Sequence, residues 1–460
     1  MEDWEVSATA IQRLVAGRTY YVDTYGCQQN EADSATIRGL LERCGYVAAA
    51  SRDIADVVVI NTCSVREHAE AKVFGVIGSL VPIKRERPDM IVAVCGCMAQ
   101  REGAADRLRE SYRHVDLVFG THAVDKLPTL LLEVVQSRGR VFDVESSDGA
   151  ISEGLPSVRD GSVKAFLSVM YGCDNFCSYC VVPYVRGRER SRMPEPILRD
   201  ARELLDSGVR DITLLGQNVN SYGKKLDVAI TFPELLRRFD AFPDEFRLRF
   251  MTSHPKDAGD ALFRAMAESK HAARCLHLPF QSGSSRVLNM MNRRYTREQY
   301  LALIARAREL MPDIVLTSDV IVGFPGETLE DFEETMSLID EVRFDALFTF
   351  IYSPRPGAPS YLTENNTPPD EIQRRFERLV NRQNDISEEI HAGYIGKTVR
   401  VLIDGDGTAR TDGNRLVKLT VDSGQWTVGD AARGLVGEFR DVRITGANRW
   451  SLTGELTDSR

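Results

Sequence analysis

Hydrophobic runs and polar helical stretches alternate along the first third of the chain. The runs "TYYVDTYGC" (19–27), "ADVVVINTC" (55–63) and "MIVAVCGC" (90–97) are rich in β-branched and aromatic residues, which is typical of strands. Helical stretches such as "SATIRGLLERCG" and "SVREHAEAKVFGVIGSL" follow them. The alternation predicts an α/β domain built on a parallel sheet.

A second α/β region follows, with six further strand-like runs separated by helical stretches. The runs lie at 164–172, 211–217, 246–252, 274–280, 313–323 and 344–352. Six βα units predict a partial or complete barrel, of which a (βα)6-type partial barrel is the expected form, with its chemistry at the carboxyl ends of the strands. Residues 143–162, before this region, are acidic and rich in Gly, Ser and Pro, which predicts a linker.

After a long helix expected near 369–391, the pattern changes to short alternating strands with Gly- and Asn-containing turns. This pattern predicts a small β-barrel of about 65 residues. The expected division is an N-terminal extension (1–16), an α/β domain (17–142), the linker (143–162), the partial barrel (163–392) and the terminal β-barrel (393–458).

Composition narrows the class of protein. The 460 residues carry a net charge of −9, which argues against a generic nucleic-acid coat, so any RNA contact must use local basic patches. No apolar run approaches the roughly 18 residues that a membrane span needs, and the first ten residues are acidic. We therefore expect a soluble, cytoplasmic protein without a membrane partner.

The chain has nine cysteines, an odd number that disfavours a disulfide framework. Cys27, Cys63 and Cys97 each end one of the first three strand-like runs, 36 and 34 residues apart. Because the carboxyl ends of parallel strands share one edge of a sheet, we expect these thiols to converge. The alternative is three unrelated buried thiols, since free cysteine is among the most buried residue types.

Cys95 competes with Cys97 for the third position, because residues two apart face the same side of a strand. The pair Gly96-Cys97 repeats Gly26-Cys27, which favours Cys97 without excluding Cys95. The remaining isolated cysteines, Cys44 and Cys275, are expected to be buried.

A second group of cysteines, Cys173, Cys177 and Cys180, lies in "YGCDNFCSYCVVPY" (171–184). The C-x3-C-x2-C spacing is too tight for strands of a sheet and suits a loop around a compact metal centre. Iron–sulfur clusters and structural zinc sites usually have four ligands, and no fourth Cys or His lies nearby. Three ligands on a cubane would leave one iron free to bind a small molecule; zinc and chance clustering are the alternatives.

The stretch "CDNFCSYC", at the end of the first barrel strand, resembles the signature of the radical S-adenosylmethionine superfamily. The resemblance implies that the open iron chelates the cofactor and that an electron from the cluster cleaves it to a 5′-deoxyadenosyl radical. It places Tyr179 beside the adenine. By position and by the matching stretches "LLGQNVNSYG" and "SDVIVGFPGET", the resemblance implies that Gln217 and Asn218 contact the methionyl end and that Gly323 and Pro325 shape the adenosine pocket; plain turn chemistry is the alternative for these four.

Three N-terminal stretches, "TYGCQQNEADS", "NTCSVREHAEAK" and "VCGCMAQRE", closely resemble the methylthiotransferases of that superfamily. The resemblance covers roughly residues 17 to 458, including "HLPFQSGSSRVLNMMNRRY" and a tail similar to the RNA-binding TRAM domain. It implies a second [4Fe-4S] cluster on Cys27, Cys63 and Cys97, and so selects Cys97 over Cys95. Gln29 and Ala35 depart from the residues common in the family, Met and an acidic residue.

Within that family the similarity is to the tRNA enzymes that convert N6-isopentenyladenosine 37 to its 2-methylthio form. This implies that two molecules of S-adenosylmethionine are used, one to methylate a cluster-bound sulfur and one to yield the radical. The implied partners are the tRNA anticodon stem-loop and an electron donor such as flavodoxin or ferredoxin.

The substrate-facing edge is predicted from "VRGRERSR", which follows the second cysteine group. Its alternating arginines suit phosphate contacts, and a solvated charged loop is the alternative. These arginines are Arg186, Arg188, Arg190 and Arg192. Two other hypotheses remain open: a sibling methylthiotransferase acting on threonylcarbamoyl-adenosine or a ribosomal-protein aspartate, and a noncatalytic iron–sulfur or zinc RNA-binding protein.

Overall fold

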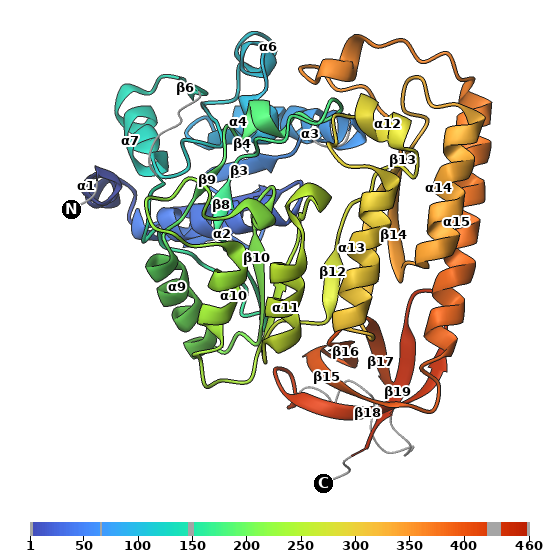
Figure 1. Ribbon diagram of the computed structural model, residues 1–460. Coiled ribbons are helices and arrows are strands. Elements are labelled where there is room, and N and C mark those ends of the chain that lie inside the picture. Colours follow the sequence, from blue (N-terminus) through green and yellow to red (C-terminus); the bar gives the residue numbers. More distant parts are fainter. Residues whose placement is uncertain (1–2, 65–66, 146–150, 421–433, 458–460) are drawn as a thin grey trace.

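The computed structural model describes residues 3–64, 67–145, 151–420 and 434–457, and Figure 1 shows three successive regions. The N-terminal region holds a six-stranded, wholly parallel sheet in the order β2-β1-β3-β4-β5-β6. Its strands are β1 (Thr19–Thr24), β2 (Val47–Ala48), β3 (Val57–Thr62), β4 (Ile91–Gly96), β5 (Leu117–Phe119) and β6 (Val141–Asp143).

Both faces of this sheet are buried, as the apolar central strands dictate. Val57 and Val59 of β3 face one hydrophobic core, whereas Val58 and Ile60 face the other. The first core also contains residues of α1 (Asp3–Val15), α2 (Gln28–Arg43) and α7 (Leu127–Ser137). The second contains or contacts residues of α3 (Glu67–Ser79), α4 (Val81–Glu86), α5 (Cys97–Gln100) and α6 (Ala104–Ser111).

The central region contains six parallel strands in two three-stranded sheets, ordered β11-β10-β7 and β12-β13-β14. An isolated bridge between Leu248 and Ala272 joins β11 to the segment before β12. Among the described strands, the outer edges of β7 and β14 pair with nothing, so the barrel is partial. The strands are β7 (Lys164–Ser168), β10 (Asp211–Leu215), β11 (Arg247–Phe250), β12 (Cys275–His277), β13 (Val315–Val322) and β14 (Ala346–Ile351), with a small antiparallel ribbon of β8 (Met170–Tyr171) and β9 (Arg190–Ser191).

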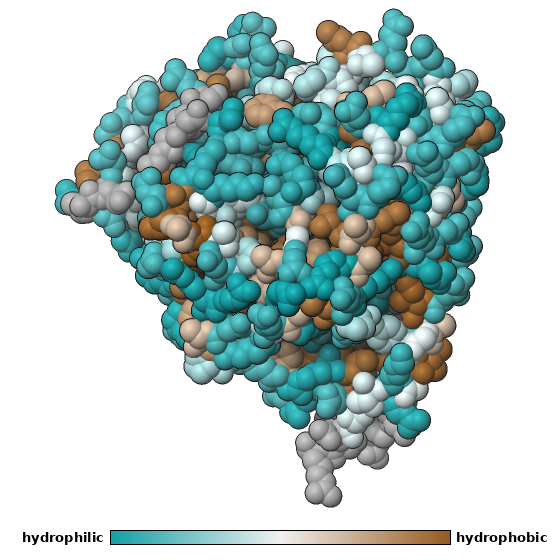
Figure 2. Space-filling view, viewed as in Figure 1, coloured by the Kyte–Doolittle hydropathy of each residue, from teal (hydrophilic) through white to brown (hydrophobic). Residues whose placement is uncertain are grey.

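Amphipathic helices cover the outside of these strands, and the largest hydrophobic core among the described residues lies between the two layers. The outward surface of these helices is mostly hydrophilic in Figure 2. All helices of the central region are α8 (Val182–Val185), α9 (Pro194–Asp206), η1 (Val219–Ser221), α10 (Phe232–Phe239), η2 (Pro255–Asp257), α11 (Asp260–Glu268), α12 (Ser285–Met290), α13 (Arg297–Leu310), α14 (Leu329–Val342), η3 (Pro359–Leu362) and α15 (Pro369–Ala392), of which the longer ones form the outer layer.

The last region is a closed barrel of five short strands in the order β15-β16-β17-β19-β18. It lies at the amino-terminal ends of the central strands, away from their carboxyl ends (Figure 1). Arg247 and Arg249 at the start and middle of β11 donate to backbone carbonyls of this barrel. Its strands are β15 (Thr398–Gly405), β16 (Thr408–Thr411), β17 (Leu416–Thr420), β18 (Phe439–Ala447) and β19 (Leu452–Leu456).

The predicted fold class is confirmed: a parallel α/β domain, a six-stranded partial barrel and a small β-barrel follow one another. The short strands β2, β5, β6, β9 and β16 were not predicted, because two to four residues carry too little periodicity to detect. Part of the predicted linker, 146–150, and part of the tail, 421–433, lie outside the described residues. The domain boundaries stay predictions. No helix in the described part of the chain is long and apolar enough to cross a membrane.

Candidate active site

The three N-terminal cysteines stand where neighbouring strands end. Cys27 precedes α2, Cys63 follows β3, and Cys97 begins α5 directly after β4. The register pairs Thr24 with Asn61 and Thr62 with Gly96, so the three thiols lie at one edge of the sheet. Cys63 and Cys97 are buried, whereas Cys27 is exposed.

Besides burial, the pKa of Cys97 reflects the other two thiols, which supports the proximity of the three cysteines. Burial raises the pKa of Cys97 to about 11; nearby Arg186 opposes this rise, and the thiols of Cys63 and Cys27 add to it. Cys95 packs instead within the hydrophobic core that contains Ala93 and Phe119. The thiols that approach one another are therefore Cys27, Cys63 and Cys97, the set that we call the N-terminal triad.

The second set, Cys173, Cys177 and Cys180, forms the barrel triad in the loop between β8 and α8. Burial raises the pKa of both Cys173 and Cys180 to about 12, with a further contribution from the Cys177 thiol. Backbone hydrogen bonds hold the loop, from Cys173 N to Gly187 O at 3.1 Å and from Ser178 N to Met291 O at 3.0 Å.

The arrangement bears on the kind of metal group that these thiols could hold. Among the described residues, no three His, Cys, Asp or Glu side chains are arranged to hold a single metal ion. Iron–sulfur clusters are held by cysteine thiolates, one to an iron, so three cysteines leave one of four irons without a protein ligand. The donor chemistry of both triads therefore fits an iron–sulfur cluster with one position left open.

A buried arginine donates to one sulfur of each triad. Arg186 Nε lies 3.2 Å from Cys97 Sγ, and its Nη2 pairs with Asp33 at 2.9 Å. Arg293 Nη1 lies 3.4 Å from Cys177 Sγ and 3.3 Å from the Tyr179 hydroxyl. Positive charge beside a thiolate favours its ionised form, which is the form that binds metal. Sequence reasoning missed Arg293, because only packing distinguishes it from the exposed arginines around it.

A polar bridge connects the two domains between the triads. The Gln29 side chain donates to Asp33 and to Ser168, both at 2.9 Å, and accepts from Gln217 at 3.4 Å. Gln217 in turn accepts the backbone N–H of Gly172, next to the barrel triad. Gln29, a departure from the common family residue, thus joins α2 to the carboxyl ends of β7 and β10.

Several buried polar atoms at the ends of the barrel strands find no protein partner among the described residues. They are Asn175 Oδ1, Asn218 Oδ1, Ser253 Oγ and His254 Nε2. Burial, followed by the charge of Arg293, lowers the pKa of His254 far below its usual range, so its ring is neutral. Orphaned buried polar groups are costly unless a ligand satisfies them. The region therefore fits a polar ligand such as the methionyl part of S-adenosylmethionine.

The predicted adenosine-side residues lie in the barrel triad loop and just after β13. Tyr179 contacts the apolar cluster that includes Ile321 and Phe324. Gly323 has φ +73°, and a Cβ there would lie 2.7 Å from the Ile372 side chain, so the turn requires glycine. Pro325, two residues on, is buried.

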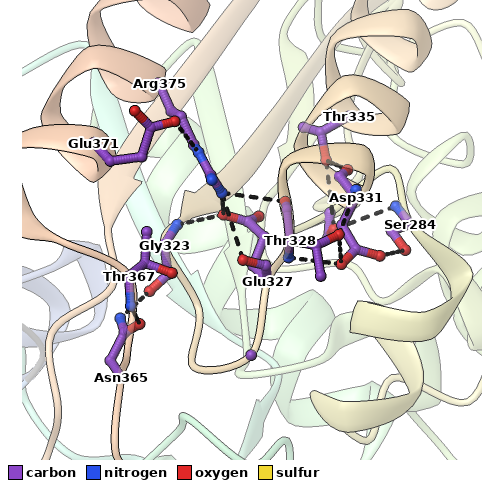
Figure 3. A network of polar contacts seen from close by, with 12 residues as sticks. Ser284, Gly323, Glu327, Thr328, Asp331, Thr335, Asn365, Thr367, Glu371 and Arg375 are labelled. Carbon is purple, nitrogen blue, oxygen red and sulfur yellow. Dashed lines mark hydrogen bonds and ion pairs between the residues drawn. The ribbon is translucent and has the colours of Figure 1, made fainter.

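A buried carboxylate stabilises this turn (Figure 3). Glu327 accepts the Gly323 N–H at 2.7 Å, and its Oε2 is 3.8 Å from Arg375 of α15. Burial raises the pKa of Glu327 to about 7, because the Gly323 N–H and Arg375 offset only part of the desolvation.

Two of the four arginines predicted to contact phosphate lie inside the protein. Arg186 is held by Asp33 and Cys97, and Arg192 pairs with Glu153 and Asp200. Their alternation with small and polar residues suggested a surface edge, but both guanidinium groups pair with partly buried carboxylates and point inward. Arg188 is exposed and remains a candidate, and partly buried Arg190 contacts His122.

Known protein families match all three regions of the chain. The Radical SAM superfamily matches residues 167–339, the TRAM domain matches 393–457, and the family described as uncharacterized protein family UPF0004 matches 19–120. A tRNA-2-methylthio-N(6)-dimethylallyladenosine synthase from Acetivibrio thermocellus is 46% identical over 446 residues, which is 95% of this chain and 91% of the relative. The chain belongs to this family.

A second family member, from Alkaliphilus oremlandii, is 45% identical and spans 95% of this chain and 93% of its own length. Among solved structures, the radical S-adenosylmethionine methyltransferase TsrM from Kitasatospora setae superposes with a TM-score of 0.55 at 16% identity, covering 75% of each chain. That likeness concerns the fold alone. Membership of the Radical SAM superfamily implies a [4Fe-4S] cluster and S-adenosylmethionine.

Proposed function

We propose that this protein is a radical S-adenosylmethionine tRNA methylthiotransferase that modifies C2 of N6-isopentenyladenosine at position 37 of tRNA, giving 2-methylthio-N6-isopentenyladenosine. The observation that carries the proposal is the pairing of two cysteine triads across one domain junction, each with a buried arginine. The printed names of the relatives, which match over nearly the whole chain, support the substrate.

The chemistry explains why the fold needs this arrangement. The C2–H bond of an adenine is unactivated, and acid–base groups cannot remove that hydrogen at neutral pH. When bound, the cluster and S-adenosylmethionine supply a carbon radical that can. The chain itself holds the thiolates, seats the cofactor and aligns the two sites.

We infer that each triad holds one [4Fe-4S] cluster. For the N-terminal triad the support is the mutual influence of its three thiols and the donation from Arg186. For the barrel triad, beyond burial, the support is the influence of the Cys180 and Cys177 thiols on the pKa of Cys173 and the donation from Arg293 to Cys177. A bound cluster replaces the protons of thiols whose pKa burial has raised.

The proposed macromolecular partner is the anticodon stem-loop of tRNA. Residues 393–457 match the TRAM domain, and exposed Arg188 lies next to the barrel triad loop. The reaction needs an electron donor, for which flavodoxin or ferredoxin is the expected class. A tRNA substrate places the reaction in the cytoplasm.

The test is an anaerobic reaction of the reconstituted protein with tRNA that carries N6-isopentenyladenosine, followed by mass spectrometry of the nucleosides. A mass gain of one methylthio group on that nucleoside is the expected result. Formation of 5′-deoxyadenosine without this gain would instead favour a sibling substrate, namely threonylcarbamoyl-adenosine tRNA or a ribosomal-protein aspartate.

Substitution of the cysteines separates the two triads. Cys177→Ala should abolish 5′-deoxyadenosine formation, whereas Cys63→Ala should retain some uncoupled cofactor cleavage and make no methylthio product. The wild-type protein should contain about eight irons per chain, since each cluster has four. Normal product from either variant, or zinc in place of iron, would contradict the proposal.

A further inference from the structure

Strand β14 has large apolar side chains that the described part of the chain covers only in part. Phe348 is 50% exposed and Phe350 is 36% exposed, although both belong to a strand of the central barrel. Neighbouring β13 is mostly buried. Exposed aromatic surface on a barrel strand is unfavourable in water and is a common feature of binding sites.

The strand register shows which way these rings point. In the parallel β13–β14 pair, Asp319 is opposite Phe348 and Ile321 is opposite Phe350. Directly paired residues project from the same face of a sheet. Leu316 and Val320, of the opposite parity in β13, belong to the core under the outer helices. Phe348 and Phe350 therefore face the barrel interior.

The same β13–β14 pairing shows how far Phe348 and Phe350 lie from the carboxyl ends of the barrel strands. Phe350 stands level with Ile321, which packs in the apolar cluster with Tyr179 beside the barrel triad. Phe348 is one step deeper and contacts the His277 ring edge-on, with 5.7 Å between centroids. His277 Nε2 is 3.5 Å from Asp319, so the apolar wall has a polar edge.

We propose that Phe348 and Phe350 are specificity-determining residues that hold the prenyl side chain on N6 of the substrate adenine. This inference rests on the proposed function and deepens it. The rings offer apolar contact on the interior wall next to the proposed cofactor seat, and β14 borders the unpaired side of the barrel. The five-carbon branched prenyl group is the apolar part of the named substrate, whereas adenine and ribose carry polar edges.

The test compares two anticodon stem-loop RNAs, one with N6-dimethylallyladenosine and one with unmodified adenosine at position 37. Equilibrium binding is measured with the reconstituted full-length protein. The wild type should prefer the prenylated RNA, and Phe348→Ser or Phe350→Ser should each reduce this preference by about tenfold, since small changes in an apolar pocket carry such factors. Phe348→Leu, which keeps an apolar contact, should retain most of the preference.

Ile54→Ser provides the matched control, because Ile54 is 59% exposed but lies in the N-terminal domain. It should leave both affinities unchanged. The inference is overturned if the Phe variants weaken both RNAs equally, change neither, or lower the affinity for S-adenosylmethionine instead. The methylthio product of the wild type is measured separately. If the product forms but the Phe variants keep the preference for prenylated RNA, this inference fails and the proposed function stands. If no product forms, the proposed function fails whatever the RNA preference is.

Discussion

Glu327 is a buried carboxyl group whose charge is costly to the folded protein. Burial raises its pKa from 4.5 to about 7. The folded state therefore binds more protons than the unfolded state between these values, and stability falls as pH rises through that window. The full effect is about 3 kcal/mol, from 1.36 kcal/mol per pKa unit.

Glu327→Gln should remove this dependence, because an amide oxygen can still accept the Gly323 N–H but cannot ionise. We expect the free energy of unfolding of the variant, relative to the wild type, to rise by about 3 kcal/mol between about pH 5 and pH 8. Urea denaturation at several pH values measures it. Glu330→Gln, at an exposed position in the first turn of α14, is the control; an equal pH response in both variants would contradict the assignment.

At the scale of elements, the short helix α8 joins the two halves of the site. Its C-cap, Arg186, reaches Asp33 on α2 and Cys97 on α5, with side-chain exposures of only 6% for Arg186 and 13% for Asp33. Removal of one partner of such a pair leaves a buried charge uncompensated, which costs about 3–5 kcal/mol. Arg186 therefore positions the N-terminal triad against the barrel.

We expect Arg186→Gln to lower the iron content from about eight toward about four per chain, because one cluster of four irons is lost. Cofactor cleavage at the barrel triad should persist. Iron quantification and 5′-deoxyadenosine analysis measure the two effects. Arg188→Gln, two residues away and exposed, should keep all its iron and weaken RNA binding instead; equal iron loss in both variants would rule out a special role for Arg186.

The cysteines and the strands that carry them could be predicted because both signals are local. An apolar run of β-branched residues predicts a strand, and Cys27, Cys63 and Cys97 each follow such a run. The burial of Arg186 and Arg293 could not be predicted, since it depends on partners far along the chain. The sequence likewise predicts only an N-terminal extension at 1–16, whereas the structure has helix α1 there, with Trp4 and Ile11 buried in the N-terminal core.

At the scale of the whole molecule, α15 connects the proposed cofactor turn to the terminal barrel. Near its start Arg375 donates to the Thr328 carbonyl at 3.1 Å (Figure 3), and at its end His391 lies 2.7 Å from the Asn448 carbonyl. Between them, Ser387 donates to Asp345 O at 2.9 Å, just before β14. The helix spans about 36 Å at 1.5 Å per residue. It therefore contacts the central barrel along the length of the helix and reaches the terminal barrel at its end.

The terminal barrel is anchored to the central barrel by an ion pair deep at their junction. Arg249 Nε contacts both Asp211 oxygens, at 2.9 and 3.1 Å, and its other nitrogens donate to the carbonyls of Thr411 and Asp412. Arg249→Leu would leave Asp211 buried without its counter-charge and free these carbonyls. We expect a loss of about 3–5 kcal/mol and faster proteolysis at the junction.

Two further variants show whether this loss comes from the junction. Arg400→Leu removes an exposed ion pair with Glu245 and should change stability by less than about 1 kcal/mol. Adding Asp211→Leu to Arg249→Leu should recover much of the loss, because two apolar side chains leave no buried charge. 5′-Deoxyadenosine formation should continue in every variant, since the barrel triad lies at the opposite end of the strands. If Arg249→Leu is no less stable than Arg400→Leu, the anchor lies elsewhere in the junction.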